Sequence, residues 1–173
     1  MLSVLIETRN DEERLARTLA VLVGAVVEGV VREVIVCDRG SSDQTHYVAE
    51  HAGCQFLAQG GIAAGIARAK GDWLLIVEPG AKLIEGWIEP AMMHMGKSMM
   101  PARFSRSRHD RQPYWARLFS ARRALAEGLV ISKRQASALA RNSANAEGLA
   151  RGLATKQLTG EIAPAPSKQL SSS

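Results

Sequence analysis

Short apolar runs alternate with longer amphipathic stretches along the first half of the chain. The apolar runs predict strands at residues 3–6, 34–37, 54–57 and 73–77. Helices are expected at residues 11–23 and 42–52, and residues 60–70 are expected to form a loop that leads into a helix of small residues. Strand–helix–strand order with short links is typical of a parallel sheet with right-handed crossovers. The pattern therefore predicts an α/β fold with a mainly parallel sheet and helices on both faces.

Polar residues follow the first two predicted strands directly. Thr8 and Asn10 come after the first strand, and Asp38 and Asp43 come after the second. The carboxyl ends of parallel strands meet at one edge of a sheet, where ligands commonly bind, so these side chains are expected to lie together with Asp38 facing a crevice. The alternative is that Asp38 and Asp43 merely cap the following helix.

Two segments carry a resemblance to a known family. They read Ser-Val-Leu-Ile-Glu-Thr-Arg-Asn-Asp-Glu from Ser3 and Glu-Val-Ile-Val-Cys-Asp-Arg-Gly-Ser-Ser-Asp-Gln-Thr from Glu33. Both resemble the first two strand motifs of the nucleotide-sugar-dependent glycosyltransferases of family 2. The resemblance implies an A-type glycosyltransferase fold, a UDP or GDP sugar as ligand, and transfer of the sugar to an unknown acceptor.

The resemblance also implies roles for particular residues. It places Thr8, Asn10 and Asp38 near the nucleoside and Arg68 where the family often has a polar or basic residue. Glu7 stands where the family usually has proline.

The fourth predicted strand ends in a departure from the family pattern. The family has an Asp-any-Asp motif that helps to hold a divalent cation, whereas this chain has Glu78-Pro79-Gly80. Glu78 is the remaining candidate metal ligand, for Mg²⁺ or Mn²⁺, and also a candidate catalytic residue. A Gly80→Asp substitution is expected to strengthen metal dependence.

A second departure concerns the general base. The family's acidic pair, commonly Glu-Asp, corresponds best to Glu147-Gly148, so Glu147 is the candidate base. A lone glutamate at a helix start is also a favourable contact with the helix dipole. The loss of two carboxylates supports a competing hypothesis, a non-catalytic binding or regulatory module that keeps the glycosyltransferase fold.

The formal net charge of +5 arises largely from arginines within residues 103–123. Arginine suits phosphate, so Arg103 and Arg106 are candidate ligands of the diphosphate, in place of or beside a metal. The same segment would suit an anionic membrane surface, and a solvated surface is the simplest alternative. No nucleic-acid-binding module accompanies it, so nucleic acid is not an expected partner.

The remaining features concern organisation and location. Residues 1–160 are expected to form one domain and residues 161–173, with two prolines and three terminal serines, a flexible tail. Cys37 and Cys54 are expected to be reduced. No signal peptide and no apolar run of spanning length is recognised. We therefore expect a cytoplasmic protein, with the inner membrane face as the surface that the arginine segment would contact.

Overall fold

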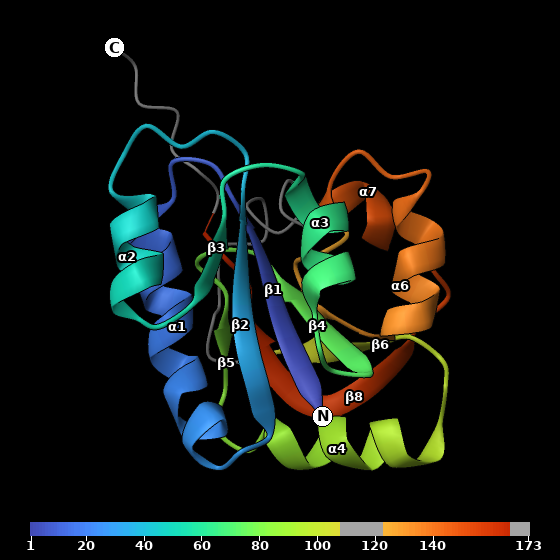
Figure 1. Ribbon diagram of the computed structural model, residues 1–173. Helices are drawn as coiled ribbons and strands as arrows, with labels where there is room; N and C mark the ends of the chain where they lie inside the picture. Colours follow the sequence, from blue (N-terminus) through green and yellow to red (C-terminus); the bar gives the residue numbers. More distant parts are fainter. Residues whose placement is uncertain (108–122, 167–173) are drawn as a thin grey trace.

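The computed structural model describes residues 1–107 and 123–166, which form one mixed sheet covered by helices (Figure 1). The strand order across the sheet is β3-β2-β1-β4-β7-β6-β8-β5. The strands are β1 (Leu2–Thr8), β2 (Val31–Asp38), β3 (Gln55–Leu57), β4 (Trp73–Val77), β5 (Lys82–Leu83), β6 (Ala102–Arg106), β7 (Leu129–Ser132) and β8 (Lys156–Ala163).

The direction of the strands changes at the middle of the sheet. β3, β2, β1 and β4 are parallel, as the sequence pattern predicted, and Ile6 pairs with both Val36 and Val77. β7 is antiparallel to β4 and to β6, whereas β8 is parallel to β6 and antiparallel to β5. The tips of β1, β2 and β4 therefore lie at one edge of the sheet.

Helices cover both faces of this sheet, which confirms the predicted fold class. The helices are α1 (Glu12–Val27), α2 (Thr45–His51), α3 (Gly61–Arg68), α4 (Ile88–Lys97), α6 (Lys133–Ala140) and α7 (Ala146–Ala150). One hydrophobic core joins α1, α2 and α4 to one face, and a second joins α3, α6 and α7 to the other. The result is a three-layer α/β/α arrangement.

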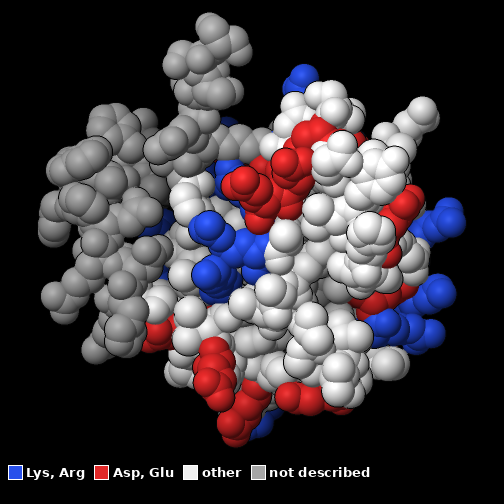
Figure 2. Space-filling model, turned by 90° about the vertical axis from the view of Figure 1, so that its left-hand side faces the viewer, with Lys and Arg blue, Asp and Glu red and all other residues white. Residues whose placement is uncertain are grey.

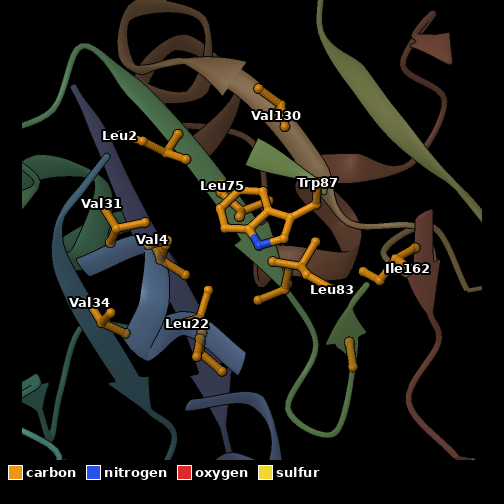
Figure 3. Packing of buried hydrophobic residues seen from close by; sticks show 14 of the residues in the cluster. Leu2, Val4, Leu22, Val31, Val34, Leu75, Leu83, Trp87, Val130 and Ile162 are labelled. Carbon is orange, nitrogen blue, oxygen red and sulfur yellow. The ribbon is translucent and has the colours of Figure 1, made fainter. Parts of the chain in front are cut away.

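The alternation of side chains along β1 explains why the strand is apolar on both sides. Val4 points into the core under α1, together with Leu22, Val34 and Leu75 (Figure 3). Leu5 points into the opposite core under α3. A strand buried on both faces reads as a continuous apolar run, which is how the sequence revealed it.

Helix α3 approaches the sheet closely because it carries a glycine at the contact. A Cβ atom added to Gly65 would lie 2.3 Å from the Cys37 sulfur and 3.1 Å from a Leu5 methyl carbon. Cys37 is fully buried, and burial raises the pKa of its thiol to about 12. Both cysteines are unpaired, as expected.

The predicted boundary between domain and tail is wrong. Residues 161–163 belong to β8, which lies between β6 and β5 inside the sheet. Ile162 is fully buried and contributes to the core under α1. The prolines at positions 164 and 166 suggested a tail, but the alternating burial of β8 begins upstream of them. Residues 167–173 lie outside the described residues.

Candidate functional site

The tips of β1 and β2 are joined by a hydrogen bond between the side chains of Thr8 and Asp38. Thr8 Oγ1 donates to Asp38 Oδ1 at 2.8 Å, and the two side chains are almost completely buried. Thr8 and Asp38 are also paired in the strand register. The structure thus brings together two of the residues that the sequence assigned to the nucleoside.

Asp38 accepts further hydrogen bonds from the loop that follows it. Its carboxylate accepts from the Gly40 amide at 3.0 Å, the Ser41 amide at 2.7 Å and the Ser41 hydroxyl at 2.5 Å. Burial favours a higher pKa for Asp38, but the hydrogen bonds from Ser41, Thr8 and Gly40 outweigh it and lower the pKa. Asp38 is only 4% exposed, so it is enclosed by its loop and does not face the expected crevice.

The loops after β1 and β2 hold each other by reciprocal hydrogen bonds. Asn10 adopts a left-handed backbone with φ 53°, and its side-chain oxygen accepts from the Ser42 amide at 2.7 Å. In return, the Asn10 amide donates to the Ser41 hydroxyl at 2.8 Å. A second exchange joins the helix starts, where the Glu12 amide donates to Asp43. These loops therefore form one unit around Asp38.

Glu78, directly after β4, lies in a cluster of charged side chains. The Arg123 guanidinium lies 3.0 Å from Glu78 Oε2, and Arg123 also donates to the Ala165 carbonyl at 2.6 Å. The approach to Glu78 is an ion pair without hydrogen-bond geometry. Burial raises the pKa of Glu78, and the nearby Glu147 carboxylate acts in the same direction, against the opposing charges of Arg123, Arg14 and Arg106.

Gly80, the other position of the family's acidic motif, is surrounded closely. Its φ of +97° favours glycine, and an added Cβ would lie 3.1 Å from Arg14 Nε and 3.3 Å from the Ala165 Cβ. Arg14 is held there by a 3.0 Å hydrogen bond from Nε to the Pro79 carbonyl. The Gly80→Asp substitution that the sequence predicted to add a metal ligand would therefore be strained at this backbone, and Arg14 and Ala165 would have to shift by a few tenths of an ångström to admit the side chain.

Glu147 lies in the first turn of α7, and its carboxylate is used by the backbone. It accepts hydrogen bonds from the Ala124 amide and, at 3.1 Å, from the Leu125 amide. It thereby fixes the turn that precedes β7. Neither alternative from the sequence included this contact, which joins residues far apart in the chain.

The two described arginines predicted to bind the diphosphate make structural contacts. Arg103 donates to the carbonyls of Ala124 and Ala150, and so ties β6 to α7. Arg106 forms an ion pair with Glu127 at 3.0 Å. The arginines at positions 108, 111, 117 and 122 lie outside the described residues, as does most of the segment expected to contact a membrane.

Arg68 lies away from this edge of the sheet. Helix α3 begins beside the tip of β1, where Gly61 is close to Glu7, and ends at Arg68 near the start of β4. Two contacts place the end of α3 at the opposite edge of the sheet. Ser132 pairs with Trp73 at the start of β4, and the next residue, Lys133, donates to the Ala67 carbonyl beside Arg68. An eight-residue helix spans about 12 Å, so the structure does not bring Arg68 to the nucleotide-binding candidates.

Sequence reasoning missed the roles of Glu7 and Arg14. Glu7 Oε2 accepts a hydrogen bond at 3.0 Å from the Ala146 amide, so the residue that replaces the family's proline anchors the start of α7. Arg14 contacts Gly80, as described above. No local sequence signal identifies either contact, because the partners are 139 and 66 positions away.

Charge on the surface is mixed around these elements. Figure 2 shows the face that carries α1 and α2, on which acidic and basic side chains form adjoining groups. Among the described residues, no helix is both long and apolar enough to cross a lipid bilayer.

The three-layer fold matches the nucleotide-diphospho-sugar transferase architecture of solved structures. Residues 3–151 match the model of Glycosyl transferase family 2. The chain belongs to this family.

Solved structures with the same fold include glucosyl-3-phosphoglycerate synthase from Mycobacterium tuberculosis. Its complex with Mg²⁺ and UDP has a TM-score of 0.71, with 16% identity, and the match covers 97% of this chain and 72% of that one. Its complex with Mn²⁺ and UDP-glucose has a TM-score of 0.65, with 15% identity, covering 98% and 72%. At this identity the likeness shows the fold.

A nearer relative in sequence is a TPR repeat-containing protein of Synechococcus elongatus. The two chains are 39% identical over 89 residues, which is 47% of this chain and 21% of the relative. The match therefore spans about a fifth of that protein's length.

Proposed function

We propose that this chain binds a nucleotide-sugar at the tips of β1, β2 and β4 and transfers the sugar to an acceptor. The observation that carries the proposal is the buried Thr8–Asp38 pair, which lies in the two motifs most similar to the family and at the same edge of the sheet as the end of β4, which Glu78 follows. A UDP sugar is the favoured donor because the solved structures of this fold include complexes with UDP and UDP-glucose.

The Asp38 loop would form the nucleoside side of the site. Because hydrogen bonds from the protein already hold the Asp38 carboxylate, this residue would act by fixing the loop shape, and exposed Asn10 and Ser42 would meet the ligand. In the transfer, the bond between the sugar's anomeric carbon and the diphosphate oxygen breaks. A bond to the acceptor oxygen forms, and the acceptor's proton leaves to a base.

A specific observation favours a second candidate, a binding module without transfer activity. Glu147 is the candidate base, and its carboxylate already accepts from two backbone amides. A carboxylate in that role is less available to accept a proton from an acceptor hydroxyl.

Two measurements test the proposal and separate the candidates. Calorimetric titration with UDP, GDP and UDP-glucose measures binding, and chromatography measures the release of UDP from UDP-glucose. Binding together with UDP release above the rate in buffer supports transferase chemistry, whereas binding without release supports the module. Absence of binding to every nucleotide refutes both.

Glu147→Gln provides a further comparison. If Glu147 is the base, the rate of UDP release by the fully folded variant falls. If Glu147 serves only the turn at Ala124, the variant loses stability, as urea denaturation would measure, and its rate at full folding stays that of the parent.

A further inference from the structure

We propose that the guanidinium groups of Arg123 and Arg14 take the place of a divalent cation in holding the ligand's diphosphate. This inference rests on the proposed function, because it concerns the same site. Its basis is that both positions of the family's acidic motif, 78 and 80, are in contact with an arginine.

At the first position, the negative charge of Glu78 is already paired with the positive charge of Arg123. Glu78 is only 14% exposed, and Arg123 lies 3.0 Å from its Oε2 atom. A metal ion that used this carboxylate would have to displace a guanidinium whose other nitrogen donates to the Ala165 carbonyl. The charge that a cation would supply is thus already present as part of the protein.

The second position offers no metal ligand. Gly80 has no side chain, its backbone is left-handed, and Arg14 and Ala165 fill the adjoining space. In the described parts of the chain, no group of three acidic, histidine or cysteine side chains is arranged to hold a metal ion. At these two positions the protein therefore offers a Mg²⁺ or Mn²⁺ ion one carboxylate, Glu78, which is already paired with Arg123, and the ion would depend on the substrate's phosphates and water for its other oxygen ligands.

The two arginines meet the requirements for phosphate binding. Their side chains are 28% and 23% exposed, so each is partly accessible to a ligand while anchored to a backbone carbonyl. Within the described residues, the hydrogen bond of Arg14 to the Pro79 carbonyl and its 3.7 Å ion pair with Asp11 Oδ1 both use Nε and not the two terminal nitrogens. A planar, permanently charged fork binds phosphate oxygens in pairs, and anchoring reduces the entropy lost on binding.

The test is calorimetric titration of the full chain with UDP and with UMP, each in EDTA and in excess Mn²⁺. For the parent, the UDP dissociation constant should change less than about twofold between the two conditions. Arg123→Ala should weaken UDP binding about tenfold to a hundredfold, the range for a hydrogen bond to a charged group, and UMP binding less. The UDP affinity of Arg123→Lys should lie between those of the parent and Arg123→Ala, because lysine keeps the positive charge and lacks the planar guanidinium fork.

Arg134→Ala is the matched control. It removes the same charge from an exposed position in α6, two residues after Ser132, which pairs with the start of β4, and should bind UDP as the parent does. Circular dichroism would verify that each variant is folded, and the EDTA comparison on the parent needs no variant.

The outcomes separate the two proposals. UDP binding that disappears in EDTA, or an Arg123→Ala variant that is folded and binds UDP like the parent, overturns this inference and leaves the proposed function standing. Failure of UDP to bind in either condition overturns this inference, and if GDP and UDP-glucose also fail to bind in the titrations described above, the proposed function is overturned with it.

Discussion

Replacing Asp38 by alanine would remove the acceptor around which the candidate site is built. Four donor groups, from Thr8, Gly40 and Ser41, would lose their partner. The Thr8 hydroxyl is the costliest, because it is 1% exposed, whereas the loop amides can be reached by water. Leaving a buried donor unsatisfied and losing hydrogen bonds to a charged group should together reduce the free energy of unfolding by about 2–4 kcal/mol.

Urea denaturation followed by circular dichroism would measure this loss. Asp72→Ala is the matched control, since it removes the same charge from an exposed side chain at the other end of β4 and should change stability by less than about 0.5 kcal/mol. UDP affinity of Asp38→Ala should also fall, because the loop that carries Ser41 and Asn10 loses its shape. A folded variant with unchanged stability would refute the view that Asp38 organises these loops.

Two further outcomes are expected. Gly65→Ala should destabilise the protein by about 1–3 kcal/mol, because the added methyl group overpacks against Cys37. In a double-mutant cycle measured by urea denaturation, Cys37→Ala should relieve much of that cost, and additive effects would contradict the contact. Burial tends to raise the pKa values of Asp38, Asp43 and Glu33, but the hydrogen bonds that each carboxylate accepts outweigh burial and lower all three pKa values. The stability that these three ionised carboxylates contribute should be complete above about pH 5 and be lost as the pH falls below about 4. A urea midpoint that is the same at pH 3 as at pH 7 would disprove this expectation.

The sequence predicted the parallel half of the sheet well because its signals are local. The apolar run 73–77 coincides with β4, and the polar residues after β1 and β2 do meet. The last three residues of β8, 161–163, were assigned to a tail because prolines lie close to them. Their place in the sheet depends on pairing with β6, about 55 positions earlier, which periodicity does not report.

The candidate site could be predicted only where it depends on neighbouring residues. The Thr8–Asp38 pair followed from two motifs and one sheet rule, whereas Arg68 was placed by resemblance alone and lies at the other edge. The hydrogen bond from the Ala124 amide to Glu147 and the contact of Arg14 with Gly80 join residues that are far apart in the chain, so they arise from tertiary packing. Sequence showed which carboxylate was missing at position 80, but only the structure shows what occupies the space.

The position of β8 has a consequence for synthesis on the ribosome. The parallel half of the sheet, β1 to β4, is complete once residue 77 has emerged, and it can begin to form while the remainder is being made. Strand β5 pairs with β8, so it waits until residues 162 and 163 arrive. A nascent chain arrested shortly before residue 156 would therefore expose the edge of β6 and an unpaired β5, both open to aggregation and to capture by chaperones.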